Sequence, residues 1–334
     1  MTSSRITRPA LLAVFLIALL MPAGASAGTV SMDVDQSARS VRDYWTKARM
    51  RDAEPAPVTV PTLPAPAEEP AAPAESGPPA YVPPAAPGDG DARLFRGEAA
   101  RSRPSVKLAT PVLDPSAPGV RAHGKVFFTV KGGTDPGDFV CSGTAVNSRN
   151  RSVVWTAGHC VYDAELGGGK SVNFSFVPAY VNGNAPYGEW PAKQLVTAKQ
   201  WKRFANFRFD LGAAVVRRLN GRTLQATIGA RGIGFDQPRP KHFDIFGYPA
   251  KLPFTGELEY RCASSNKGSD SPGGKGPTTM RSSCNMTPGS SGGGWIAAGT
   301  LFSVTSYSYE SEPGHLYGPY LSRTAKRLYK RVRR

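Results

Sequence analysis

Short apolar runs recur about every ten residues from residue 123 onward, and this spacing constrains the fold more than any other feature of the chain. The runs are rich in β-branched and aromatic residues, and clusters of Gly, Pro or Asn separate them. This pattern predicts an all-β sandwich or barrel. Residues 121–334 are too many for one small barrel and suit two, which we place at 121–220 and 221–320. The runs cover residues 126–130, 152–155, 172–177, 211–216, 243–246 and 300–304.

The end of the chain follows a different pattern. Four apolar residues fall at the spacing of a helix, and basic residues gather toward its C-terminal end, where the helix dipole favours them. We therefore expect a helix over residues 321–333, with Ser322 as its N-cap. The four apolar residues are Leu321, Ala325, Leu328 and Val332.

Residues 1–27 have the pattern of a secretory signal peptide. Arg5 and Arg8 precede an apolar run over residues 10–21, and small residues at 25–27 form a cleavage site. A transmembrane helix is the alternative, but the run is too short because a span needs about 20 apolar residues. We therefore expect a secreted, extracellular protein without stable membrane insertion.

Residues 28–120 have the composition of a pro-segment or spacer. Residues 54–90 hold 12 prolines among many alanines, which predicts an extended, disordered linker. One short helix is predicted within residues 28–53 from apolar residues at a rough 3–4 spacing. The sequence leaves open whether residues 30–52 dock on the rest of the chain, and whether they then inhibit it or assist its folding.

The positive charge of the chain lies in residues 121–334. The formal net charge is +16, whereas residues 1–120 hold 12 Lys+Arg and 12 Asp+Glu. A surface this basic attracts polyanions such as an anionic cell-wall polymer, or only keeps a secreted protein soluble. No DNA-binding helix, finger or RNA-binding motif is recognisable, so we expect no nucleic-acid partner.

Three polar residues occur in sequences suited to nucleophilic catalysis. His159 follows an apolar run, Asp210 begins another, and Ser291 stands among glycines. A serine hydroxyl is a poor nucleophile until an imidazole takes its proton, and the imidazole needs a carboxylate to fix its tautomer. We therefore predict Ser291 as nucleophile, His159 as general base and Asp210 as its orienting carboxylate.

The glycines around Ser291 suit an oxyanion hole. Gly289 can adopt backbone conformations closed to other residues, so the amides of Gly289 and Ser291 can point at one oxygen. Ser290 is the rival nucleophile. The run also fits the elbow of α/β-hydrolases, but Gly292 and Gly293 make a poor helix start after the serine.

The chain order His, Asp, Ser and the local sequences are similar to those of the chymotrypsin-like (trypsin-fold) serine peptidases, over about residues 121–333. Residues 284–293 most resemble the glutamyl-endopeptidase branch of secreted bacterial enzymes. The resemblance implies two antiparallel β-barrels of the chymotrypsin type, with the C-terminal helix packed on the second. It also implies peptide hydrolysis through an acyl-enzyme, without a cofactor or metal.

Four cysteines in an exported chain favour disulfides, and four cysteines allow three pairings. The resemblance implies the pairs Cys141–Cys160 and Cys262–Cys284. A metal site is the alternative, but no close Cys-x-x-Cys spacing supports it.

The sequence departs from the family at two places. Ser290 stands where many members have an Asp that pairs with a new N-terminal amine, so we do not expect that activation step. Asn285, Thr305 and Ser306 occupy the expected specificity pocket, where other branches carry an Asp or a His. Because none of the three is charged, we expect a preference for small or neutral side chains.

We thus predict a secreted, monomeric serine endopeptidase that acts on proteins or peptides. One alternative is a protease-like module that binds a surface through its basic face, with weak or no catalysis. Another is an esterase on the same fold, because acyl transfer from esters uses the same groups.

Overall fold

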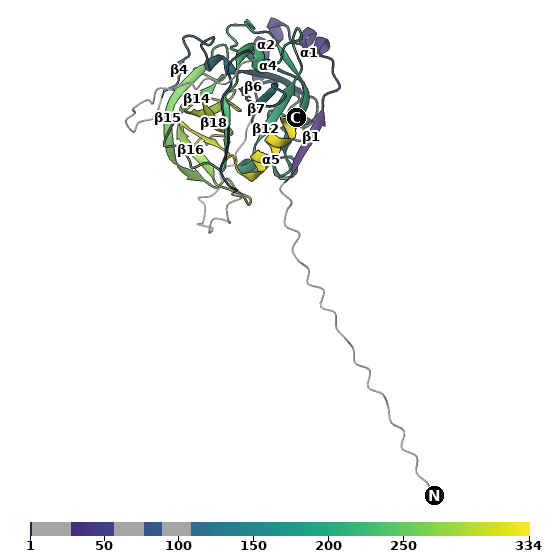
Figure 1. The fold of residues 1–334 in the computed structure, drawn as a ribbon, viewed down its shortest axis with the longest axis vertical. Coiled ribbons are helices and arrows are strands. Elements are labelled where there is room, and N and C mark those ends of the chain that lie inside the picture. Colours follow the sequence, from purple (N-terminus) through teal and green to yellow (C-terminus); the bar gives the residue numbers. More distant parts are fainter. Residues whose placement is uncertain (2–27, 57–76, 89–107) are drawn as a thin grey trace.

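A computed structural model describes residues 28–56, 77–88 and 108–334, together with Met1 (Figure 1). The predicted signal peptide and residues 57–76 of the predicted linker lie outside the described residues. Within the described residues, no helix has the length and apolar character that a membrane crossing requires.

Six antiparallel strands form a closed first barrel. Hydrogen bonds between β11 and β12 complete the ring, in the order β11-β10-β5-β6-β7-β12. Predicted apolar runs fall in four of these strands, β5, β7, β10 and β12, and alternate side chains of the six strands fill the interior with residues such as Val126, Val154 and Leu195. The strands are β5 (His123–Val130), β6 (Gly137–Val146), β7 (Val153–Thr156), β10 (Val172–Pro178), β11 (Trp190–Ala198) and β12 (Gly212–Val216).

The second half of the chain forms the second sheet. The strand order is β19-β16-β15-β14-β17-β18-β13, and its core includes Phe243 stacked on Trp295. The all-β fold class is confirmed, although β13 and β18 pair in parallel where the prediction had only antiparallel strands. The strands are β13 (Gly232–Phe235), β14 (His242–Gly247), β15 (Tyr260–Asp270), β16 (Thr279–Ser283), β17 (Gly294–Ala297), β18 (Thr300–Val304) and β19 (His315–Gly318).

The predicted C-terminal helix is α5 (Arg323–Val332). It packs on β11 and β12 of the first barrel and on β13, so it lies at the junction of the two sheets and not on the second alone (Figure 1). Leu328 and Val332 join a shared core there with Val215 and Leu301. Ser322 stands at the N-cap, but its buried hydroxyl makes no capping hydrogen bond within the described residues.

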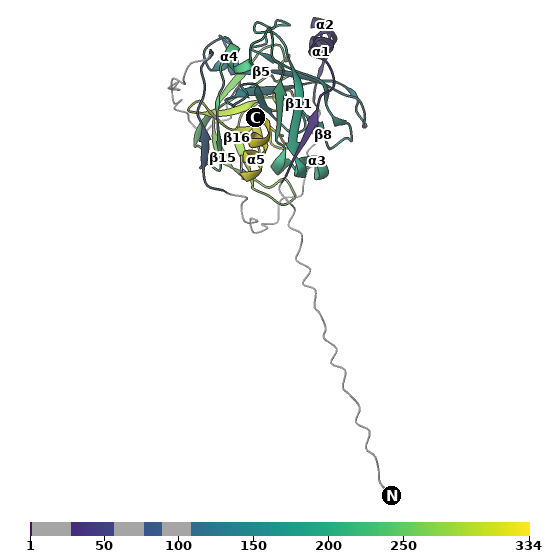
Figure 2. The same ribbon diagram turned by 45° about the vertical axis from the view of Figure 1, so that its right-hand side comes forward.

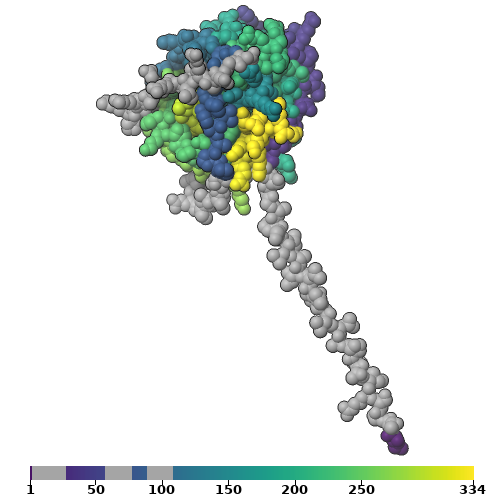
Figure 3. Space-filling view, viewed as in Figure 1, coloured from purple at the N-terminus to yellow at the C-terminus, as the bar shows by residue number. Residues whose placement is uncertain are grey.

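The described parts of residues 28–120 extend both sheets. Strand β1 (Thr29–Asp33) pairs antiparallel with β11, and Figure 2 shows the two side by side. Further strands are β2 (Glu54–Pro55), which is parallel to β6, β3 (Ala80–Val82), which pairs with β13, and β4 (Thr110–Pro111), which pairs with β15. Residues 77–88 lie on the surface beside α5, where Lys326 Nζ donates to the Pro78 carbonyl over 3.3 Å (Figure 3).

Two short helices replace the single helix expected in residues 28–53. They are α1 (Ala38–Tyr44), capped by Ser37, and α2 (Lys47–Asp52), capped by Thr46. Trp45 lies between them and is buried against Phe127 of the first barrel. This segment therefore buries its apolar side chains on the barrel and has no separate core.

Candidate active site

His159 and Asp210 meet because their strands are neighbours. His159 follows the end of β7, Asp210 precedes the start of β12, and Thr156 pairs with Gly212 across these two strands. Residues that lie far apart in the sequence are thus brought to the same end of the first barrel.

The two side chains form a tight buried pair. The imidazole Nδ1 of His159 lies 2.8 Å from Asp210 Oδ2, and the His159 backbone nitrogen donates to Asp210 Oδ1 over 2.8 Å. Asp210 is fully buried, and the Ser306 hydroxyl donates to its Oδ2 over 2.5 Å. An ionised carboxylate with three donors selects the tautomer of His159 that carries its proton on Nδ1.

The other ring nitrogen of His159 is the reactive one in this arrangement. Nε2 is buried and has no hydrogen-bond partner in the described part of the chain. Burial alone lowers the pKa of His159, but the charge of Asp210 and its hydrogen bond outweigh this, so the pKa is raised overall. A bare Nε2 with raised basicity can accept a proton from a hydroxyl that approaches it.

Ser291 lies in the turn between β16 and β17, against the first barrel. Its carbonyl accepts from the Ser142 amide over 2.6 Å, and Cys160 Sγ lies 3.9 Å from the same oxygen. A side chain built on Gly292 would come within 2.9 Å of the Ala157 nitrogen, so the two motifs are in contact. The structure contains no hydrogen bond between the Ser291 hydroxyl and His159. His159 nevertheless directly precedes Cys160, whose sulfur lies against the Ser291 carbonyl.

Gly289 has the backbone shape that the predicted oxyanion site needs. Its φ of +98° favours glycine, and a Cβ there would lie 2.6 Å from the Tyr248 carbonyl. The amides of Gly289 and Ser291 donate to no acceptor among the described residues. Ser142, which sequence reasoning missed, braces this loop because its hydroxyl donates to the Gly289 carbonyl and accepts from the Tyr248 amide, each over 2.9 Å.

Ser290, the rival nucleophile, points elsewhere. Its hydroxyl donates to the Thr287 carbonyl over 2.8 Å, and the residue is buried. This hydroxyl therefore stabilises the turn that carries Ser291.

The three residues expected in a specificity pocket have partners within the chain. Asn285 Oδ1 accepts from the Ala109 amide over 2.6 Å, and Thr305 Oγ1 accepts from the Trp295 indole over 3.0 Å. The Ser306 hydroxyl points at Asp210, so it supports the His159–Asp210 pair. Only tertiary structure reveals these contacts, because each partner lies ten or more residues away.

Both predicted disulfides are present, Cys141–Cys160 and Cys262–Cys284. The sulfurs of Cys141 and Cys160 lie near His159, but they are bonded to each other. They therefore offer no thiolate ligand for a metal.

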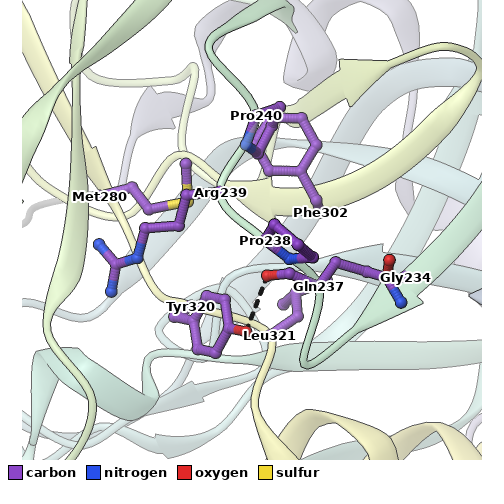
Figure 4. Close-up of a pocket in the computed structure, with 9 residues that line it drawn as sticks. All are labelled: Gly234, Gln237, Pro238, Arg239, Pro240, Met280, Phe302, Tyr320 and Leu321. Atoms are coloured by element: carbon purple, nitrogen blue, oxygen red, sulfur yellow. Dashed lines mark hydrogen bonds between the residues drawn. The ribbon is translucent and has the colours of Figure 1, made fainter. Parts of the chain in front are cut away.

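Another hollow, on the second sheet, lacks groups for acid–base chemistry (Figure 4). Arg239 lies over the Tyr320 ring and donates to Thr278 and Thr279, and the Tyr320 hydroxyl donates to the Gln237 carbonyl. The free space of about 10 Å³ holds one water at most. The candidate active site is therefore the His159–Asp210 pair with the Ser291 turn.

Comparisons with known proteins identify serine proteases as similar structures. No family model and no curated protein matches the chain. Among solved structures, the protease Anisep from Arthrobacter nicotinovorans is 39% identical, with 64% of this chain and 95% of that chain covered and a TM-score of 0.58. A thermostable serine protease, AL20, from an extremophilic microorganism is 38% identical, with 64% and 97% covered and a TM-score of 0.58. A Glu endopeptidase in complex with MPD shares the fold at 16% identity, with 68% and 97% covered and a TM-score of 0.53.

Proposed function

Because this chain belongs to the chymotrypsin-like serine proteases of the trypsin fold, we propose that it is a secreted serine endopeptidase. The observation that carries the proposal is the pair of hydrogen bonds that Asp210 accepts from His159, which leaves Nε2 without a partner, while the adjacent Cys160 lies against the Ser291 carbonyl. This is the arrangement that a serine hydroxyl requires for activation.

The proposed reaction is acyl transfer. His159 Nε2 takes the Ser291 proton as the hydroxyl oxygen attacks the peptide carbonyl, and Asp210 stabilises the imidazolium that forms. The amides of Gly289 and Ser291 receive the oxyanion. His159 then gives the proton to the leaving amine, and water hydrolyses the acyl-enzyme by the same steps.

The proposed substrates are proteins or peptides with a small or neutral side chain before the scissile bond. Asn285 and Thr305 are uncharged, and Thr305 Oγ1 already accepts from the Trp295 indole of the proposed mature domain. The likeness to the Glu endopeptidase extends to the fold only, so it does not argue for acidic substrates.

We propose that residues 28–120 are a pro-segment and that the chain is made as a zymogen. The two more similar proteases are covered almost entirely, yet roughly a third of this chain has no counterpart in them. Two disulfides suit an oxidising, extracellular environment.

A basic surface supports the proposed binding of an anionic cell-wall polymer. An open hollow of about 550 Å³ is lined by five cations without an acid, and the last two arginines border the adjoining hollow. A chain of phosphates or carboxylates would be drawn to such a surface. The cations are Arg149, Arg151, Lys193, Arg217, Arg218, Arg333 and Arg334.

Labelling with an irreversible serine-hydrolase reagent tests the proposal. We expect stoichiometric modification at Ser291, together with cleavage of casein and of peptide libraries. A folded, mature protein that is unlabelled but binds polyanions would instead be a surface-binding module. Labelled protein that cleaves esters and no peptide would be an esterase.

A further inference from the structure

His159 borders a hollow that is both apolar and acidic. Its apolar wall includes Phe128, Phe139 and Leu166, and its acids are Asp135, Asp163 and Glu165. This inference rests on the proposed mechanism, which places the part of the substrate that follows the scissile bond at this hollow. Because His159 protonates the leaving amine, the residues that follow the scissile bond must lie on the histidine's side.

Among the three acids, Glu165 is the one free to meet a substrate. The carboxylate of Asp163 accepts the amides of Glu165, Leu166 and Gly168, so it holds the loop in shape. Asp135 is exposed to solvent, which screens its charge. The Glu165 carboxylate has no hydrogen bond or ion pair with any described residue, and burial raises its pKa to about 8.

A cation would supply the Glu165 carboxyl with the partner that it lacks. A partly buried carboxyl without a partner has lost hydration, and it regains favourable interactions when a positive charge arrives. The aliphatic stem of a long basic side chain can lie on the apolar wall while its charged end reaches Glu165. A neutral or acidic side chain would leave the carboxyl without that partner.

We infer that this hollow binds a lysine or arginine side chain at one of the first two residues after the scissile bond, and that Glu165 selects its charge. This specificity is independent of the neutral preference proposed for the residue before the bond.

While residues 28–56 are in place, Ala56 forms part of the wall of the hollow and narrows it. Strand β2 runs parallel to β6 toward Cys141, and the Ala56 amide donates to the Val140 carbonyl over 3.1 Å. Ala56 is 3% exposed and lines the hollow, and the remaining space of about 20 Å³ suits one water. A basic side chain can therefore enter only after residues 28–56 have left.

Paired peptide substrates test the charge selection. The full chain is expressed, the enzyme is recovered from the medium, and kcat/KM is measured for peptides with lysine or norleucine at the first or second residue after the cleaved bond. We expect wild type to prefer lysine about tenfold at one position. Glu165→Gln should reduce the preference to less than about twofold, mainly by lowering kcat/KM for the lysine peptides.

Glu310→Gln is the matched control, because it makes the same substitution at an exposed site outside the hollow. It should keep the full preference. Equal lysine and norleucine rates in wild type, or an unchanged preference in Glu165→Gln, would overturn the inference. If no peptide is cleaved and Ser291 stays unlabelled, the proposed function fails as well.

Synthetic peptides test the role of Ala56. A peptide of residues 28–56 should inhibit cleavage of the lysine substrate competitively, and a peptide of residues 28–55 should inhibit at least several-fold less. Equal inhibition by the two peptides would contradict narrowing of the hollow by Ala56. So would a full lysine preference in an enzyme that still carries residues 28–56.

Discussion

Asp210 binds His159 twice, once at the ring Nδ1 and once at the backbone nitrogen, each over 2.8 Å. The second bond fixes the carboxylate relative to the main chain, so the ring cannot turn without losing its partner. Ser306, which follows β18, adds a third donor and ties the pair to the half of the molecule that carries Ser291.

Replacement of Asp210 by Asn should lower kcat about 10⁴-fold. The amide would keep the shape but favour the tautomer with its proton on Nε2, which cannot accept the Ser291 proton. Steady-state kinetics on a peptide substrate measure the effect. Ser306→Ala should lower kcat much less, since it removes only one of the three hydrogen-bond donors to Asp210. An equal loss of kcat in the two variants would contradict the assigned roles.

Ser291→Ala should abolish peptide cleavage and labelling, whereas Ser290→Ala should retain most of both. The Ser290 hydroxyl is bound to the Thr287 carbonyl, so its loss affects only the turn. Circular dichroism confirms that both variants fold. The reverse pattern would transfer the nucleophile to Ser290.

Activity should fall with acid at a pH above the ordinary pKa of histidine. The base must be neutral, and Asp210 raises the pKa of His159 from its usual value of 6.5 despite the opposing effect of burial. This fall is the acidic limb of the profile of kcat/KM against pH, measured with a substrate that has no titratable groups. A limb centred below 6.5 would show that the carboxylate does not stabilise the imidazolium.

Trp45→Ala should loosen residues 28–56 from the first barrel. The indole donates to the Asn173 carbonyl over 2.5 Å and packs on Phe127, and truncation of a buried Trp costs about 3–5 kcal/mol. Hydrogen exchange should show faster exchange in β1 with little change in β6. Arg39→Ala is the control, because its side chain is exposed and pairs with Asp43 of the same helix; equal exchange in the two variants would argue against Trp45 as the anchor.

Loss of cations at the basic hollow should weaken polyanion binding. Arg149→Gln with Arg218→Gln should reduce the affinity for polyphosphate about fivefold and reduce its dependence on salt. Lys131→Gln with Lys241→Gln removes the same charge at exposed sites that do not line the hollow. If both double variants bind equally weakly, net charge rather than this surface controls binding.

The residues of the histidine–aspartate pair and six of the strands, β5, β7, β10, β12, β14 and β18, could be predicted from the sequence. Apolar runs mark the strands because each is buried on both faces, as all eight residues of β5 are. The disulfides followed from the family resemblance, since spacing alone allowed three pairings.

The contacts of the N-terminal segment could not be predicted. Strand β2 has two residues, too few to show the alternation of apolar and polar side chains that marks a strand. The methyl side chain of Ala56 gives no indication in the sequence of where it packs. Trp45 is held by the carbonyl of Asn173, a group that every residue possesses. The parallel pairing of β13 with β18 likewise depends on how the two sheets meet.

Strand β1 covers one side of β11 at residues 194–198, while β10 contacts β11 only near Trp190. Departure of the N-terminal segment would therefore remove the β1 partners of residues 194–198 and leave an unpaired sheet edge, although residues 194–197 would keep their pairing with β12. Such an edge accepts any extended chain that reaches it. Loss of the N-terminal segment would thus expose an unpaired strand edge at the same time as it widens the hollow beside His159.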